Sequence, residues 1–328
     1  MPGTHQNQPM RSIIAYPLSL DRFQPLERVL VYDEFDNGFN GWMSLMPNFT
    51  QAPNFDIRHS IVDKTRFPPV MLSSATFRYP GTHGAMNGTY SLKLATRPVA
   101  NRYEEVPDPE GLAQAIKRLS FHRSPRGLLQ FEMWFAYTVE QDRVSGEEDL
   151  AGIGERSVRA FGAGFDLHYD QHRYFIGARY LNSVNGELKK KWQVMKASDV
   201  SDVEWTYGSE GEWAKTGVDP MWYGRRYADG THDGYKDVLG GTQDLCYNET
   251  DCKINWLYFR LTVDAHNRRY VEMQAQDQTF DLSGFEFTQI PPYARIDRLL
   301  NPLVWVENDT DRRVFLYLDS VVVSTGDS

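Results

Sequence analysis

The stretch Val314–Ser324 reads Val-Phe-Leu-Tyr-Leu-Asp-Ser-Val-Val-Val-Ser. Near the other end of the chain, Val29–Trp42 reads Val-Leu-Val-Tyr-Asp-Glu-Phe-Asp-Asn-Gly-Phe-Asn-Gly-Trp. Both stretches are rich in β-branched and aromatic residues, which are typical of strands. Each also carries at least one acidic residue where a packed strand does not favour it. The pattern predicts a β-sandwich whose first and last strands close on each other.

Alternation of apolar and polar residues predicts further strands between these two ends. The predicted strands are residues 70–79, 88–96, 127–138, 161–169, 173–181, 187–194, 255–264, 268–276 and 303–307. In the strand 127–138, the odd-numbered residues from Leu129 to Tyr137 are all apolar, so this face should pack in the core. One short helix is expected at Gly111–Leu119, because Asp108-Pro109 before it suits a helix cap and first turn.

Many strands, hairpin spacing and little helix favour an all-β fold, an antiparallel two-sheet β-sandwich of jelly-roll type. We expect residues 1–27 to form an N-terminal arm and residues 28–328 a single domain. Residues 196–254 lack alternation and are rich in Gly, Asp, Glu, Trp and Tyr. A structureless loop of this length is uncommon unless it is functional, so we interpret it as an insertion that lies over one face.

Charge and hydropathy narrow the class of function. The chain of 328 residues has a formal net charge of −9, which disfavours nucleic acid as a partner. No apolar run approaches the roughly 18 residues of a membrane span, and the polar start lacks the apolar region of a signal peptide. A cytoplasmic protein is therefore predicted, or a secreted one if the N-terminus was trimmed. A homo-oligomer is left open.

Motifs exclude several reaction classes and leave two modifications open. The sequence has no glycine-rich phosphate loop, nucleophile elbow or His-rich metal motif. Cys246 and Cys252 fit a small loop-closing disulfide or two free thiols equally well. Four Asn-x-Ser/Thr sequons occur, at Asn48, Asn87, Asn248 and Asn308. Without a signal peptide we do not expect them to be glycosylated.

Four segments resemble the concanavalin A-like lectin/glucanase jelly rolls. They are Tyr-Asp-Glu-Phe-Asp at 32–36 with Trp42, Asn-Gly-Thr-Tyr-Ser-Leu-Lys-Leu at 87–94, Trp-Leu-Tyr-Phe-Arg-Leu-Thr-Val-Asp at 256–264, and Leu-Tyr-Leu-Asp-Ser-Val-Val-Val at 316–323. The resemblance implies a two-sheet sandwich and a carbohydrate ligand. It does not fix an activity, because this superfamily contains lectins, glycosidases, lyases and non-catalytic modules.

Two signatures within that superfamily bear on catalysis. The Glu-x-Asp-x-x-Glu strand of its laminarinase-type members is missing, so no glycosidase pair is carried over from the resemblance. The stretch Tyr-Phe-Ile-Gly-Ala-Arg-Tyr at 174–180 is similar to the Tyr-Phe-Lys-Ala-Gly-x-Tyr strand of polysaccharide lyases, but it lacks the Lys.

Carboxylates and one histidine on the polar strand faces are the candidates for acid/base chemistry. Glu132 lies mid-strand, where a desolvated carboxylate would suit acid catalysis. Asp166 and His168 are two residues apart and thus share one side of a strand, with glycines at 162 and 164 leaving room for a ligand. We expect Glu132 or Glu272 to be the acid, and Asp166 with His168 to supply the base or orient water. The alternatives are cross-strand ion pairs and a solvated polar face.

Aromatic and polar side chains on these strands are candidates to bind a sugar. The expected substrate-binding residues are Gln130, Trp134, Arg179, Trp256, Tyr258, Arg260, Tyr270, Gln274 and Trp305. Four aromatic residues of the insertion could either stack on sugar rings or anchor the loop to the sandwich: Trp205, Trp213, Trp222 and Tyr223. Structural Ca²⁺ is possible if the end strands meet, because Asp33, Asp36 and Asp319, together with Glu34, would then offer hard oxygen ligands. The alternative is a set of surface acids. No organic cofactor is expected.

These features predict a protein that binds and cleaves a glycan or glycoside on the concave face of a β-sandwich, through carboxylate and His chemistry. One alternative is a non-catalytic, lectin-like or assembly module. Another is a polysaccharide lyase that acts on a uronic sugar. In a lyase, Arg179 or Arg260 would neutralise the sugar carboxylate, and His168 or a tyrosine would be the base.

Overall fold

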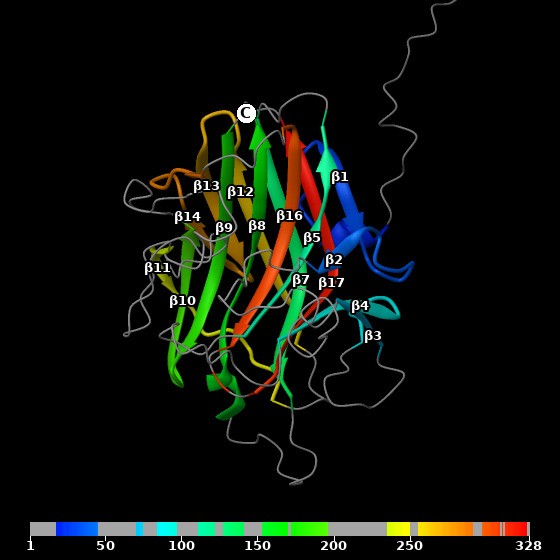
Figure 1. The fold of residues 1–328 in the computed structure, drawn as a ribbon, viewed down its shortest axis with the longest axis vertical. Coiled ribbons are helices and arrows are strands. Elements are labelled where there is room, and N and C mark those ends of the chain that lie inside the picture. The colour runs from blue at the N-terminus through cyan, green and yellow to red at the C-terminus, as the bar shows by residue number, and fades with distance from the viewer. Residues whose placement is uncertain are drawn as a thin grey trace, which may run out of the picture.

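The computed structural model describes residues 18–44, 70–74, 84–96, 111–121, 127–140, 153–169, 172–195, 235–249, 255–290, 297–308, 310 and 312–326. The regular secondary structure of this part of the chain consists of β-strands and two short 3-10 helices, η2 (Leu18–Arg22) and η3 (Ile153–Ser157). The strands form two antiparallel sheets that stack face to face (Figure 1). The predicted all-β, two-sheet sandwich is confirmed.

The sheets, called A and B here, contain eight and nine strands. Sheet A is formed by β1 (Arg28–Asp33), β3 (Met71–Ser74), β4 (Tyr90–Ala95), β7 (Leu128–Val139), β12 (Leu257–Asp264), β13 (Arg269–Ala275), β14 (Gln278–Asp281) and β17 (Val314–Gly326). Sheet B is formed by β2 (Trp42–Ser44), β5 (Gly111–Lys117), β6 (Leu119–Ser120), β8 (Val158–Tyr169), β9 (His172–Val184), β10 (Glu187–Met195), β11 (Tyr235–Thr242), β15 (Thr288–Ile290) and β16 (Leu299–Asn308).

The first and last strands lie side by side in sheet A. Strand β1 pairs antiparallel with β17, from Arg28 opposite Thr325 to Asp33 opposite Val321. Figure 1 shows them as the adjacent blue and red strands. On the other side, β17 pairs with β7 along twelve residue pairs. The prediction that the two chain ends close the sandwich is therefore confirmed.

The core lies between the sheets and is built from alternate residues of the strands. The ring of Phe131 in β7 lies 5.8 Å from Phe165 of β8, and Phe135 lies 5.1 Å from Phe161. These four rings are fully buried. Replacing one such phenylalanine by alanine costs about 3–5 kcal/mol in comparable cores. Pairs of this kind hold the two sheets together.

The predicted helix at 111–119 is wrong, because residues 111–117 form strand β5. This strand pairs with β16 on one side and with β2 on the other. Ala113 and Ala115 are buried in the core, so the alternation of small apolar residues with Gln114 and Ile116 serves a strand. Pairing on both sides outweighs the helix preference of alanine, which is worth a few tenths of a kcal/mol per residue.

Part of the predicted insertion is also strand. Residues 235–242 form β11, which pairs with β10 at the edge of sheet B. Residues 196–234 and 250–254 lie outside the described residues, and so do Trp205, Trp213, Trp222, Tyr223, Asn48 and Cys252. Cys246 is an exposed free thiol. The amides of Asn248 and Asn308 are buried and donate to backbone carbonyls, so neither suits glycosylation in the folded protein.

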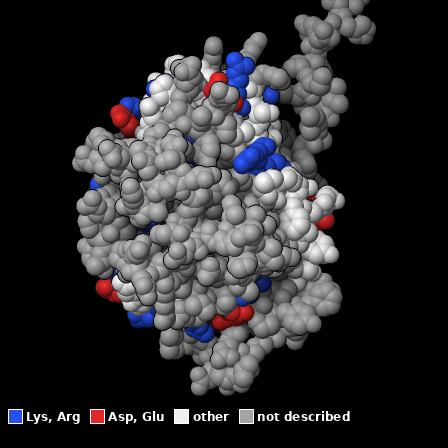
Figure 2. All heavy atoms as spheres, viewed as in Figure 1, with Lys and Arg blue, Asp and Glu red and all other residues white. Residues whose placement is uncertain are grey.

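The surface and the hydropathy of the described residues add two facts. Acidic and basic side chains lie interspersed around the rim of the face shown in Figure 2. No helix in the described part of the chain is long and apolar enough to cross a membrane.

Candidate functional site

The predicted site residues divide between the two outer faces of the sandwich. Those on the outer face of sheet A are Gln130, Glu132, Trp134, Trp256, Tyr258, Arg260, Glu272 and Gln274. Those on the outer face of sheet B are Asp166, His168, Arg179 and Trp305. Packed sheets lie about 10 Å apart, with the core between them. Glu132 and Glu272 therefore cannot form one acid/base set with Asp166 and His168, and that part of the prediction is wrong.

Tyr270 lies in neither face but inside the core. It is fully buried; its hydroxyl donates to the carbonyl of Met195 at 2.8 Å and accepts from the Gly177 N–H at 2.9 Å. In the pairing of β12 with β13, Thr262 lies opposite Glu272 but Val263 lies opposite Tyr270. Val271 is thus the extra residue of a β-bulge, which turns Tyr270 to the opposite face. Strict alternation predicted a sugar-facing Tyr270 and is wrong here.

Residues 18–27 of the N-terminal arm lie on the outer face of sheet A, and Gln24 binds Glu132. The backbone N–H of Gln24 donates to Glu132 Oε2 at 2.8 Å, and the Gln24 carbonyl accepts from Gln130 Nε2 at 2.7 Å. Tyr258 donates its hydroxyl to Glu132 Oε2 at 2.6 Å, and Gln130 donates to Oε1 at 2.8 Å. Glu132 is fully buried. These donors compensate for the loss of water around the carboxylate, which thereby anchors the arm.

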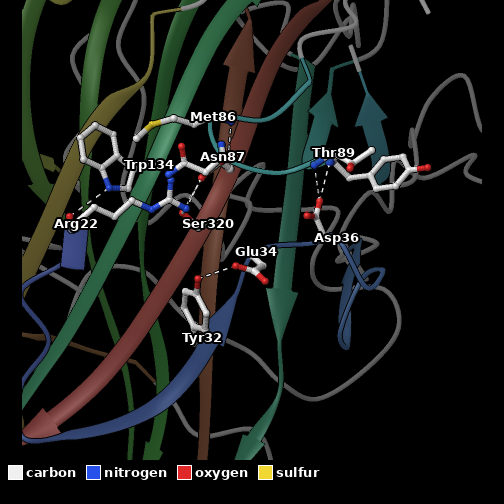
Figure 3. Close-up of polar contacts among 11 residues, drawn as sticks. Arg22, Tyr32, Glu34, Asp36, Met86, Asn87, Thr89, Trp134 and Ser320 are labelled. Carbon is white, nitrogen blue, oxygen red and sulfur yellow. Dashed lines mark hydrogen bonds and ion pairs between the residues drawn. The ribbon is translucent and has the colours of Figure 1, made fainter. Parts of the chain in front are cut away.

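Apolar side chains and an ion pair complete the contact between the arm and sheet A. Leu20 and Phe23 are buried against Tyr258 and Val322. Arg22 pairs with Asp319 at 2.7 Å, and Figure 3 shows its guanidinium beside Ser320, to which it donates at 2.8 Å. The half-buried indole of Trp134 donates to the Arg22 carbonyl at 3.4 Å. Two of the aromatic residues predicted to bind sugar on this face, Trp134 and Tyr258, thus contact the arm.

The remaining predicted residues of sheet A form ordinary surface pairs. Arg260 Nη2 donates to Glu272 at 2.6 Å across strands β12 and β13, which is the alternative considered for these residues. Its Nη1 also donates to Gln24 Oε1 of the arm. The Glu272 side chain is 38% exposed, so this pair is worth less than about 1 kcal/mol. Gln274 Nε2 donates to the Gln276 carbonyl at 2.8 Å. Trp256 packs against the apolar cluster of Ala136 and Tyr317 at the other end of this face.

The three aspartates predicted to bind calcium are held by separate partners. Asp33 accepts from Trp42 Nε1 at 2.8 Å and from Lys117 Nζ at 2.7 Å. Asp36 accepts from the backbone N–H groups of Thr89 and Tyr90, and Figure 3 shows it apart from Glu34. Asp319 accepts from Arg22 and from the Met86 N–H. Among the described residues no three His, Cys, Asp or Glu side chains gather around a metal position, so this set does not fit calcium.

On the outer face of sheet B, Asp166 joins residues from three strands into a buried network. Arg173 of β9 donates to it twice, from Nε at 2.8 Å and from Nη2 at 2.9 Å. His168 Nε2 lies 3.3 Å from Asp166 Oδ2, and Asn301 Nδ2 of β16 donates to the same oxygen at 3.1 Å. The register explains the meeting, since Asn301 lies opposite Asp166 and Arg173 lies opposite His168. We call these four residues the Asp166 cluster.

Electrostatics fix the protonation state of Asp166. Burial alone would raise its pKa, but the charge of Arg173, with hydrogen bonds from His168 and Arg173, holds the pKa well below the usual range. Asp166 is therefore an anion at any physiological pH, and it favours a proton on His168 Nε2. In the neutral ring, this tautomer leaves the lone pair on Nδ1. Asp166 thus orients His168 and cannot itself be an acid.

Two polar atoms of the Asp166 cluster have no hydrogen-bond partner among the described residues. They are His168 Nδ1 and Asn301 Oδ1. Both residues are buried, with exposed fractions of 2% and 4%. A buried polar atom without a partner costs about 1–3 kcal/mol. Such atoms are uncommon in folded proteins, and two in one network mark a place where a ligand or water belongs.

A second network, the Glu307 cluster, lies on the same face. It consists of Arg159, Arg179, Gln193, Trp305 and Glu307. Trp305 Nε1 donates to Glu307 at 3.0 Å, Arg179 lies 3.4 Å from the same oxygen, and Arg159 lies 3.5 Å from the other. Arg179 also donates to Gln193 Oε1 at 2.9 Å. Arg159 takes part because it is the extra residue of a bulge, since Glu307 lies opposite Ala160 and Asn308 opposite Val158.

The glycines of this face do not leave room for a ligand as predicted. A side chain at Gly162 would collide with the Trp305 indole, and one at Gly177 would come within 3.1 Å of it. A side chain at Gly164 would meet the backbone of Ile176. Trp305, which is 1% exposed, therefore fills the space above Gly162 and Gly177. The glycines serve the packing of this indole.

The two networks are too far apart to act as one catalytic pair. Asn301, opposite Asp166, and Glu307 are six residues apart along β16. At about 3.3 Å per residue, roughly 20 Å separates them. The two carboxylates of a glycosidase lie about 5–9.5 Å apart. Asp166 and Glu307 therefore do not form a glycosidase pair.

Sequence reasoning missed Arg159, Arg173, Gln193, Asn301 and Glu307. A signal existed for Glu307, because alternation places it on the same face as Trp305. Asn301 had none, since its meeting with Asp166 depends on the register between β16 and β8. Arg159 was hidden by its bulge.

Comparison with known proteins shows the family. Residues 10–327 match the family described as "Domain of unknown function (DUF6772)". The chain belongs to this family. No curated protein is similar to it in sequence.

Similar solved structures were found at low similarity. The Emp47p carbohydrate recognition domain has 10% identity and a TM-score of 0.34, over 78% of this chain and 94% of that one. An alginate lyase from Chlorella virus has 9% identity and a TM-score of 0.36, over 78% and 89%. Peanut lectin has 7% identity and a TM-score of 0.35, over 77% and 90%.

Proposed function

We propose that this protein binds a carbohydrate on the outer face of sheet B, at the Asp166 cluster. One observation carries the proposal, the buried pair of His168 Nδ1 and Asn301 Oδ1 without partners among the described residues. A sugar hydroxyl can donate to Asn301 Oδ1, and a neighbouring hydroxyl can donate to His168 Nδ1. The resemblance of the sequence to jelly-roll lectins and glucanases supports sugar as the ligand that bears these hydroxyls.

A further acceptor extends this surface. Gln114 of β5 lies opposite Trp305, and its Oε1 is buried without a partner among the described residues. Leu303 of β16 lies between Asn301 and Trp305 on the same face. Unpaired acceptors at both ends of this row suit an extended oligosaccharide better than a single sugar ring.

Binding can be tested with the full chain and a panel of neutral β-glucan and uronate (alginate) oligosaccharides by titration calorimetry. Asn301→Ala should weaken binding at least about tenfold, because roughly 1.4 kcal/mol of hydrogen bonding is lost. His168→Gln should weaken it less, since the glutamine amide replaces part of the contact. Gln274→Ala, on the outer face of sheet A, is the matched control. Unchanged affinity of a folded Asn301→Ala protein, or no binding of any sugar in the panel, would contradict the proposal.

If the bound sugar is cleaved, we propose elimination on a uronic sugar rather than hydrolysis. Elimination needs one base, which His168 Nδ1 can supply, whereas glycoside hydrolysis uses two carboxylates at short range. The base takes the proton from the carbon beside the sugar carboxylate. That electron pair forms the new C=C bond, and the glycosidic C–O bond breaks as the leaving oxygen takes up a proton.

This second step has its own test. The full chain is incubated with alginate oligosaccharides, and the unsaturated product is followed by its ultraviolet absorbance. His168→Gln should lower the rate of product formation at least about a hundredfold, while calorimetry still detects binding. If the wild-type protein binds the oligosaccharides but forms no unsaturated product, the lyase function is excluded and a lectin-like module remains.

A further inference from the structure

Five side chains on the outer face of sheet A lie in register on two neighbouring strands. Trp134 of β7 lies opposite Tyr258 of β12, and Glu132 lies opposite Arg260. The ring centres of Trp134 and Tyr258 are 5.3 Å apart, and Gln130 donates to Glu132 along β7. Aromatic rings beside charged and amide side chains are residue types that bind the faces and the hydroxyls of sugars. We call these five residues the sheet A surface.

The arm covers the sheet A surface mainly with backbone groups. The N–H and the carbonyl of Gln24 bond to Glu132 and Gln130, and the Arg22 carbonyl accepts from Trp134 (Figure 3). Among the described residues, these outward partners belong to the arm, so the side chains become accessible when the arm leaves. Two neighbouring sugar hydroxyls offer a donor and an acceptor side by side and can replace the backbone groups of Gln24.

The arm does not satisfy this surface completely. Arg260 donates from Nη1 to Gln24 and from Nη2 to Glu272, but its buried Nε has no hydrogen-bond partner among the described residues. The distance of 3.4 Å from Trp134 Nε1 to the Arg22 carbonyl exceeds the usual range of about 2.7–3.2 Å for such a bond. A segment that only completes the fold is expected to pair the buried donors beneath it. The two donors therefore suit a partner other than the arm.

The attachment of the arm is local. Leu20 and Phe23 pack on Tyr258 and Val322, and the polar contacts are the ion pair of Arg22 and a few hydrogen bonds. Fixing each residue of the arm costs conformational entropy, which offsets part of these contacts. A segment that lies on a sheet face can open without separating the strands beneath it. The arm can therefore leave while β7, β12 and β17 stay paired.

We propose that the sheet A surface is a second glycan site, which binds a neutral oligosaccharide and which the arm of the same chain keeps closed. The rings of Trp134 and Tyr258 pack against a sugar face, and the polar side chains bind its hydroxyls in place of the arm. Because Arg260 is paired with Glu272, the charge of Glu132 remains and repels a uronate. Arm and ligand compete, so the apparent affinity falls with the fraction of molecules in which the arm is open.

Two changes within the arm should open the surface without altering it. Phe23→Ser removes an apolar contact, and Gln24→Pro removes the N–H that donates to Glu132. Asp21→Ser, at an exposed position of the arm, is the matched control. The changes are made in the full chain, and trypsin cleavage at Arg22 that is faster than in the control reports release of the arm.

Calorimetry with cellohexaose and laminarihexaose, two neutral glycans, measures the site. Release of the arm should tighten binding at least about tenfold relative to Asp21→Ser, as expected when fewer than about one molecule in ten is open in the control. Trp134→Ala in the released protein should remove this gain. All variants also carry Asn301→Ala, which weakens the proposed site on sheet B, so that a failure of that site is distinguishable from a failure of this one.

Three results would overturn the proposal. The first is unchanged affinity for both neutral glycans in a folded protein whose arm is released. The second is a gain that survives Trp134→Ala or that is as large for an alginate hexasaccharide. The third is an arm that neither change releases, because the arm is then a fixed part of the fold. Both changes lie outside the core between the sheets, so circular dichroism should show an unchanged sandwich in each variant.

Discussion

The two outer faces of this sandwich carry similar residues in different states. On sheet A, the arm donates to Glu132 and accepts from Gln130, and Trp134 and Tyr258 pack against Leu20 and Phe23. On sheet B, the Asp166 cluster satisfies its charges internally but leaves His168 Nδ1 and Asn301 Oδ1 without partners among the described residues. A polar residue at an outward strand position therefore predicts only that its side chain points away from the core. It does not indicate whether a segment of the same chain or a ligand meets it.

The largest expected effect comes from removing the buried anion of sheet B. Asp166→Asn leaves the guanidinium of Arg173 buried without its carboxylate, and we expect a loss of about 3–5 kcal/mol in the free energy of unfolding. Urea unfolding of the two proteins measures the loss. Glu272→Gln removes one carboxylate of a partly exposed pair and is the control. A loss below about 1 kcal/mol in Asp166→Asn would show that the Asp166 cluster does not hold β8, β9 and β16 together.

The same carboxylate predicts the response to acid. The pKa of Asp166 is lower in the folded protein than in the unfolded chain, so its contribution to stability is fully present above the unfolded value of about 4. That contribution is lost as the pH falls from about 4 through the folded value. Urea unfolding of the wild-type protein at pH 7, 4 and 3 should show a steeper loss below pH 4 than Asp166→Asn shows. Parallel curves for the two proteins would contradict the assignment.

A smaller effect is expected on sheet A, where the change should release the arm. Glu132→Ala removes the acceptor of the Gln24 N–H and of the Tyr258 hydroxyl, at a cost of about 2–3 kcal/mol. Trypsin should then cut at Arg22 and Arg28 several-fold faster than in the wild-type protein. Carbohydrate binding should stay within about twofold of wild type. A large loss of carbohydrate binding in a folded Glu132→Ala protein would indicate that the binding site lies on sheet A and would contradict its assignment to sheet B.

The smallest effect is expected for the surface pair of sheet A. Glu272→Gln should lower the free energy of unfolding by less than about 1 kcal/mol, because Glu272 is partly exposed and its pair with Arg260 is screened by water. It should also leave carbohydrate binding unchanged. A tenfold loss of binding would restore Glu272 as a functional residue and contradict the assignment of the site to sheet B.

Alternation predicted the core well, because it depends only on which side of a strand each residue faces. Leu129 to Tyr137 and Phe161 to Leu167 have their predicted orientations. The bulges at Arg159 and Val271 could not be predicted this way. One extra residue turns the residues that follow it to the opposite face of the sheet, and the pattern of apolar and polar residues does not show where this happens. The same applies to Asp319, which follows a register shift after Leu318.

The site was predicted only in part. The shared orientation of Asp166 and His168 follows from their spacing, and the structure confirms that the two side chains meet. The separation of these residues from Glu132 depends on which strands join which sheet, which a single strand's pattern does not contain. The contact of the arm with Glu132 depends on a 3-10 turn at Leu18–Arg22, for which the sequence gives no periodic signal.

The most direct test of the central claim is a hydrogen-exchange footprint of the full chain with and without a saturating oligosaccharide that calorimetry has identified. If the site lies on sheet B, slower exchange should appear in peptides that cover β8, β9 and β16, around Asp166, Arg173 and Asn301. Exchange in β12 and in residues 18–27 should not change. Protection of β12 and of the arm, with no change in β8 and β16, would contradict the assignment.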